Sequence, residues 1–166
     1  MNSPFAKIYL ALMDRIKLKV PAIIHIDHDL GQLEGASARP SVAFPCVLTD
    51  FDQWQFENMG VNAQTAQGDV IVKLAFAQFG NSSGDMPEQW KKEALKYYDL
   101  EWDLHKALQG WSPGEDYGYL TRTNVSTENR APGIRIRTMR YRLEFEDYSA
   151  KPTQTTMQTP ELDLED

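Results

Sequence analysis

The sequence contains a single cysteine, Cys46, so the chain cannot form an internal disulfide, which is typical of proteins made in a reducing compartment. It has no apolar run of membrane-spanning length. The N-terminal segment also lacks the continuous apolar core of a signal peptide, because Lys7, Asp14 and Arg15 interrupt it. We therefore expect a soluble protein that is used or assembled in a cytoplasm.

Familiar catalytic motifs are missing as well. The sequence has no GxSxG, no P-loop and no GxGxxG, so neither acyl transfer nor nucleotide chemistry has support. Positive charge is scarce, because the formal net charge is −7, and this argues against a nucleic-acid footprint over the whole surface. What is present is an ordinary globular composition, 42% hydrophobic and 11% aromatic, in a chain of 166 residues. That length suits one domain with a substantial core.

Two segments have helical periodicity. Residues 87–109 form the longest such pattern, and we expect one helix that lies across a sheet with a broad apolar arc. Its polar strip consists of Lys92, Lys96, Asp99, Asp103 and Lys106. The second helix is expected between Ser3 and Val20, where apolar residues recur every three or four positions and indicate core packing. This stripe contains Phe5, Ile8, Tyr9, Leu12, Met13 and Ile16.

The remaining segments predict strands over residues 22–30, 41–51, 68–79, 119–125 and 134–148. The third has apolar residues on both faces and is expected at the centre of the sheet. Residues 52–67 are expected to be a polar connection or a hairpin arm, and residues 126–133 a loop. In the last strand the apolar residues change phase between Ile136 and Met139, which predicts a β-bulge near Arg137 and Thr138.

This order of elements predicts an α+β fold, with an antiparallel or mixed sheet of about four to five strands and two helices packed on one face. Residues 1–148 are expected to form a single domain. Residues 149–166 have no apolar periodicity and end in an acidic run, so we expect a disordered acidic C-terminal tail.

One cluster suggests a metal site. Strand alternation places His25, Asp27 and Asp29 on one face, where an imidazole and two carboxylates can hold a divalent ion. Glu101 and His105 form a further pair four residues apart. The spacing matches no metal motif, however, and a solvated polar face is the simpler interpretation. We expect no metal and no cofactor.

Six arginines make the last hairpin the one basic region of the chain. Arginines that alternate along a strand favour a solvated or protein-binding face over nucleic-acid binding, because aromatic stacking partners are sparse and acidic residues follow. The expected subunit or partner interface consists of Arg122, Arg130, Arg135, Arg137, Arg140 and Arg142.

Five stretches together resemble phage tail-terminator or tail-completion proteins, in particular prophage-encoded versions from Bacteroidetes. They are HIDHDLGQLEG, RPSVAFPCVLTDF, VIVKLAFAQF, DLHKALQGW and LTRTNVSTENRAPGIRIRTMRYRLEF. The resemblance covers about residues 3 to 148. It rests on element order and short phrases, because this family has no invariant catalytic motif. The acidic tail does not align with the family pattern.

The resemblance implies a small α+β subunit without enzymatic activity. Such subunits form a ring, most often of six, on the head-proximal end of a tail tube, stop tube growth and meet the head–tail connector. The expected partners are therefore further copies of the chain, the tail tube protein and the connector protein, in a virion tail assembled in a bacterial cytoplasm. The alternative from another class is a small metal-dependent enzyme or ligand-binding domain that uses His25, Asp27, Asp29 and His105.

Overall fold

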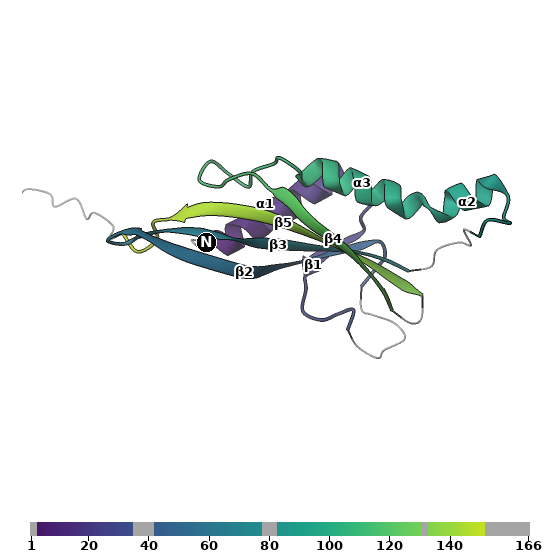
Figure 1. Cartoon of the computed structure of the whole chain (residues 1–166), viewed down its shortest axis with the longest axis horizontal. Helices are drawn as coiled ribbons and strands as arrows, with labels where there is room; N and C mark the ends of the chain where they lie inside the picture. Colours follow the sequence, from purple (N-terminus) through teal and green to yellow (C-terminus); the bar gives the residue numbers. More distant parts are fainter. Residues whose placement is uncertain (1–2, 35–41, 78–82, 131–132, 152–166) are drawn as a thin grey trace, which may run out of the picture.

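The computed structural model describes residues 3–34, 42–77, 83–130 and 133–151, and it has an α+β fold (Figure 1). Five strands form one sheet in the order β1-β2-β3-β5-β4; β1 runs parallel to β2 and all other neighbours are antiparallel. The expected class and mixed sheet are thus confirmed. The elements are α1 (Pro4–Lys19), β1 (His25–His28), β2 (Cys46–Gly60), β3 (Ala63–Ala77), α2 (Glu88–Ala94), α3 (Lys96–Leu108), β4 (Thr121–Arg130) and β5 (Ile134–Asp147).

The main core lies between one face of the sheet and the helices α1 and α3. From α1 it takes Ile8, Leu12 and Ile16, as the sequence predicts, and from α3 it takes Leu104 and Leu108. The sheet contributes alternate residues of β3 and β5, and none of them is more than 9% exposed. They are Ala66, Val70, Val72, Leu74, Phe76, Met139, Tyr141, Leu143 and Phe145. Because β3 lies between β2 and β5, the prediction of a central strand is confirmed.

The predicted β-bulge in β5 is wrong. Arg137 pairs with Leu74 and Thr138 with Lys73, in a register that is unbroken from Ile134 to Asp147. The apolar residues change from even to odd positions because the two halves of β5 bury opposite faces. Ile134 and Ile136 pack on the opposite side of the sheet from the helices, in a second small core. That core also contains Leu33, Cys46, Leu48 and Ala75, with Val42 and Phe44 against it.

The predicted single helix over residues 87–109 is two helices, which meet at Leu95. The Leu95 amide donates to the carbonyl oxygens of both Lys91 (3.1 Å) and Lys92 (3.2 Å), so the turn tightens there. α2 extends past the end of the sheet, where no core is available to it (Figure 1). Ala94 is its one buried residue, and Trp90 is 57% exposed. The polar strip expected on this segment is exposed throughout.

The polar residues 52–67 form the arms of a long hairpin, the second of the two predicted alternatives, because β2 continues to Gly60 and β3 begins at Ala63. A register shift lies between Asp52 and Gln55, where Gln53 has a φ of 53°. This bulge lays the Trp54 ring over Gly68. A Cβ atom at Gly68 would lie 2.4 Å from the Trp54 ring, so the site requires glycine. The ring also packs edge-on against Phe5 at the start of α1, 5.0 Å away.

Several boundaries differ from those predicted. The strand expected over residues 119–125 is β4, which extends to Arg130 and so includes most of the predicted loop 126–133. β1 has only four residues, and the strand expected from Ser41 starts at Cys46. Of the predicted disordered tail, residues 149–151 are described and residues 152–166 lie outside the described part. No helix among the described residues is long and apolar enough to span a membrane.

Candidate functional site

The two edge strands of the sheet, β1 and β4, each have one neighbouring strand. β4 is the last strand on one side, and its outer edge carries no strand within the described residues. On the other side β1 covers only Cys46 to Thr49 of β2. The longer part of β2, from Asp50 to Gly60, therefore also has an open outer edge in the described part of the chain. Backbone N–H and C=O groups along such edges are ready to pair with another chain.

A groove of about 640 Å³ lies on the hairpin end of the molecule. It is formed by the distal parts of β2, β3 and β5 together with the loop 115–118, which lies beside β5 where β4 has ended. The Gly118 amide donates to the Glu144 carbonyl (2.8 Å) and fixes this loop. The loop lies close to β5 at this point, because a Cβ atom on Gly118 would lie 2.9 Å from the Glu144 side chain.

The groove is acidic. Its lining contains five carboxylates, Glu57, Glu115, Asp116, Glu144 and Glu146, and none of its lining residues, all of which are described, is Lys or Arg. A single ammonium group approaches its rim, where the Lys151 Nζ lies 3.8 Å from the centre of the Tyr148 ring. We call this feature the acidic groove. Carboxylates gathered in a concave surface favour a cationic partner.

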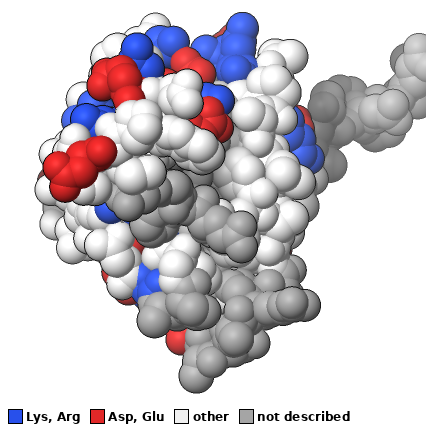
Figure 2. Space-filling model, turned by 90° about the vertical axis from the view of Figure 1, so that its right-hand side faces the viewer, with Lys and Arg blue, Asp and Glu red and all other residues white. Residues whose placement is uncertain are grey.

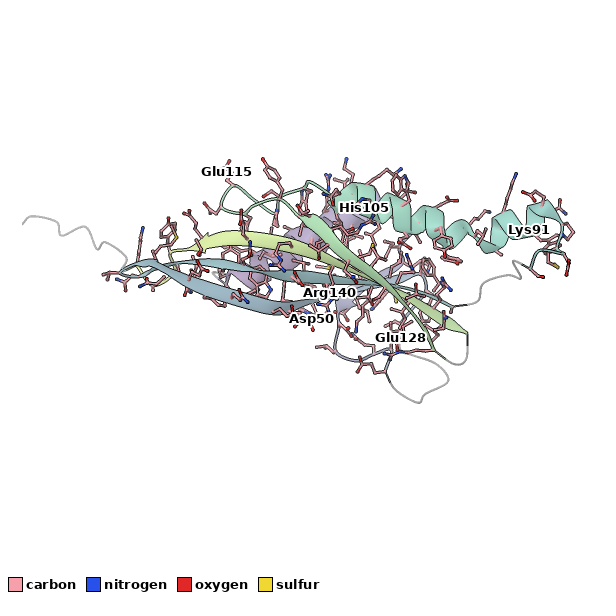
Figure 3. The ribbon with its side chains drawn as sticks, viewed as in Figure 1. Asp50, Lys91, His105, Glu115, Glu128 and Arg140 are labelled. Atoms are coloured by element: carbon pink, nitrogen blue, oxygen red, sulfur yellow. The ribbon has the colours of Figure 1, made fainter. Side chains whose placement is uncertain are left out.

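The six arginines do not form one basic face, because β4 and β5 divide them between the two sides of the sheet. Arg130, Arg140 and Arg142 lie on the side away from the helices (Arg140 is labelled in Figure 3). Arg140 binds Asp52 (2.9 Å) and Arg142 binds Asp69 (2.9 Å). These pairs tie β5 to β2 and β3 across the sheet.

Arg130 crosses from β4 to the loop after β1. Its Nη1 donates to the Leu33 carbonyl (2.7 Å) and its Nε lies 2.5 Å from Glu128. The Glu128 side chain raises the pKa of Arg130, and the hydrogen bond from Arg130 lowers the pKa of Glu128. Arg130 therefore joins β4 to the loop that contains Leu33 of the second core, and Glu128 balances its charge.

Arg122, Arg135 and Arg137 lie on the helix side. Arg137 forms a two-pronged ion pair with Glu101 of α3, with Nε–Oε2 and Nη2–Oε1 distances of 2.6 and 2.8 Å. Glu101 is 8% exposed, so this is the most buried carboxylate on α3. The hydrogen bond to Glu101 raises the pKa of Arg137. Arg135 lies over the Tyr97 ring at 4.9 Å. The interface predicted from the six arginines stays a prediction. Arg130, Arg137, Arg140 and Arg142 already form ion pairs with carboxylates of the same chain.

The candidate metal ligands do not form one cluster. His25 Nε2 lies 3.8 Å from Asp27, but Asp29 forms an ion pair with Lys73 of β3. His28 stacks on Tyr9 of α1, with ring centres 4.4 Å apart. Among the described residues, no group of three or more His, Cys, Asp and Glu side chains is arranged to hold a metal ion.

His105 and Glu101, four residues apart on α3, do not hydrogen-bond to each other. Glu101 is occupied by Arg137, and the His105 Nδ1 lies 3.3 Å from the Tyr141 hydroxyl. Burial and the nearby Arg122 cation lower the pKa of His105. Burial also raises the pKa of Tyr141 to about 12, so its hydroxyl keeps its proton at neutral pH. This cluster joins α3 to β5 as part of the core.

Two surface features do not follow from the sequence. The acidic groove assembles residues from four separate segments, so no local motif announces it. The exposed aromatic residues Trp90, Tyr98 and Trp102 were expected to pack, because they belong to the broad apolar arc, but they are 44–57% exposed. Periodicity predicts which face of a helix is apolar, but it does not show whether the sheet is long enough to cover that face.

Comparisons with known proteins identify no family. No protein-family profile matches the chain, and no curated protein matches it. Among solved structures, the chain is similar to a chain from the structure described as "Virion of native gene transfer agent (GTA) particle". The two share 11% sequence identity and a TM-score of 0.42, over 87% of this chain and 95% of the other.

Proposed function

We propose that this chain is a structural subunit of a phage or prophage tail, without enzymatic activity. Copies of it form a ring, six by the resemblance, that closes the head-proximal end of the tail tube and meets the head–tail connector. The sequence resemblance to tail-terminator proteins is the source of this proposal. The resemblance extends over about residues 3 to 148, which contain every helix and strand of the described part of the chain.

The observation that carries the proposal is the pair of open strand edges. The outer edge of β4 and the β2 edge from Asp50 to Gly60 lie on opposite sides of one sheet. The β2 edge of one copy can pair with the β4 edge of the next copy, so each contact joins two different surfaces. Contacts of this heterologous kind generate a closed ring when the rotation between neighbours closes. A ring is therefore an assembly in which every open edge has a partner.

The test is to bind the protein to tubes. Purified protein with a gold label at its N-terminus is mixed with cognate tail tubes that lack it, and the tubes are imaged by electron microscopy. The proposal expects label at one end of each tube and none along its length. Label alone must not bind, and an excess of unlabelled protein must displace the signal. Label distributed along the tubes, or absent from their ends, contradicts the proposal.

A further inference from the structure

The end of α1 forms a basic and apolar patch on the β1 side of the sheet. It consists of Lys17, Leu18 and Lys19, together with Ile24 just before β1, and we call it the α1-end patch. Leu18 is 73% exposed and Ile24 is 67% exposed. Both lysines are exposed and have no ion pair within the described part of the chain. No Asp or Glu occurs between Arg15 and Ile26.

The position of this patch follows from contacts on either side of it. Tyr9, earlier in α1, stacks on His28 of β1, so the helix runs beside this edge. The Ile24 amide donates to the Pro45 carbonyl (3.0 Å), which holds the connection between α1 and β1 against the start of β2. The patch therefore lies at the edge of the sheet that β1 forms.

The acidic groove has the opposite charge and reaches the opposite edge. Its outer wall, the loop 115–118, lies beside β5 on the β4 side of the sheet. Glu115 projects from this loop, away from the sheet (Figure 3). Tyr119, the next residue after the loop, does not line the groove, but it is 71% exposed and offers an apolar surface next to the loop. Exposed aromatic side chains of this kind often anchor protein interfaces.

We propose that the α1-end patch of one subunit docks on the acidic groove of the next copy of the same chain. This inference rests on the proposed ring and names the surfaces that meet in it. Within one chain the two surfaces do not meet, because Ile24 lies beside Pro45 at the start of β2, whereas the groove lies at the hairpin end of β2, at Gln55 and Glu57. Between copies, the Lys17 and Lys19 ammonium groups face carboxylates, and Leu18 and Ile24 leave water beside Tyr119. The contact is heterologous, as a ring requires.

The α2 end does not offer a comparable partner for the groove. Viewed from that end, Lys and Arg side chains are interspersed with Asp and Glu (Figure 2). Lys91 and Lys92 lie on α2 beside Glu88 and Glu93, so this helix has no net charge. It therefore supplies a matched control, because two lysines, Lys92 exposed and Lys91 partly exposed, can be reversed there without touching the α1-end patch.

The test uses charge reversal and rescue. One variant carries Lys17→Glu and Lys19→Glu, and the other carries Glu115→Lys and Asp116→Lys. All four side chains are exposed, so folding is expected to persist, and circular dichroism checks it. Self-association is measured by sedimentation velocity, at low and high salt. We expect each variant to associate at least ~10-fold more weakly than the wild type, because like charges then face each other.

Rescue separates a specific contact from a general effect of charge. An equal mixture of the two variants places each reversed patch opposite a reversed groove, and association is expected to return. The chain with all four substitutions is expected to associate as the wild type does. The control Lys91→Glu with Lys92→Glu makes the same change in net charge and is expected to leave association unchanged. High salt is expected to weaken the wild type, since exposed charges are screened.

A zero-length carbodiimide cross-linker reports the same contact directly, because it joins only amines and carboxylates that touch. Cross-links between Lys17 or Lys19 and Glu115 or Asp116 of another chain are expected. A wild type that stays monomeric without such cross-links, or variants that associate normally, overturns the inference. Tube-end binding that survives both charge reversals would leave the tail role standing and remove this interface. Salt-sensitive association without tube-end binding would do the reverse.

Discussion

The buried ion pair between Arg137 and Glu101 allows a sharp test of how α3 is held on the sheet. The Arg137 and Glu101 side chains are only 17% and 11% exposed, and two hydrogen bonds join them. The substitution Arg137→Met keeps the side-chain volume and removes the cation. The Glu101 carboxylate then stays buried without its partner, which is the condition under which losing half of an ion pair is most destabilising.

The expected loss is about 3 kcal/mol in the free energy of unfolding. Breaking a buried ion pair typically costs ~3–5 kcal/mol, and the lower end applies because both groups keep some contact with water. The double variant Glu101→Leu with Arg137→Met leaves no buried charge. We expect its stability to lie within about 1 kcal/mol of the wild type, because well-packed apolar residues often replace a buried pair without loss.

The single variant Glu101→Leu completes a cycle with the wild type, Arg137→Met and the double variant. Urea unfolding, followed by tryptophan fluorescence, measures all four proteins. The matched control is Lys106→Met, which breaks the exposed pair between Lys106 and Asp103 (2.7 Å) on the same helix. We expect that change to cost less than ~0.5 kcal/mol, since exposed pairs contribute little. The reasoning is refuted if Arg137→Met costs no more than the control, or if the two core substitutions add without compensation.

Three further predictions follow from burial and packing. Gly68→Ala should destabilise the protein by about 1–3 kcal/mol in thermal or urea unfolding, because the Trp54 ring must move; Gly84→Ala, with open space around it, is the control. Cys46 is fully buried and its pKa is raised to about 12, so iodoacetamide at pH 8 should modify it only after unfolding, and rapid labelling of the native protein would contradict this. Elemental analysis of protein purified without chelator should find substoichiometric metal, whereas one tightly held zinc or manganese per chain that is lost in His25→Ala would support the metalloenzyme alternative.

The sequence specifies much of this fold through local periodicity. The stripe from Phe5 to Ile16 correctly places α1 on the core, and the two-sided apolar pattern around Val72 correctly marks β3 as the central strand. β5 shows where such reasoning fails. Its phase change was attributed to a bulge, because one covered face was assumed. The structure covers the other face as well, because Leu33, Val42 and Phe44, from the segment between β1 and β2, pack with Ile134 and Ile136.

The candidate surfaces were harder to predict, because they depend on which segments meet. The six arginines belong to one hairpin, yet alternation along β4 and β5 sends Arg137 to Glu101 and Arg142 to Asp69 on opposite faces. Their carboxylate partners lie 36 and 73 residues away along the chain. The acidic groove has the same origin, since Glu57, Glu115 and Glu144 come together only in the folded sheet.

The most direct test of the proposed role is the length of tail tubes assembled without this protein. Its gene is deleted from the phage or prophage, particles are induced, and tube lengths are measured by electron microscopy. The account predicts overlong tubes of variable length that do not join heads, with normal length restored when the wild-type chain is supplied. Tubes that stop at normal length and join heads without the protein would contradict it.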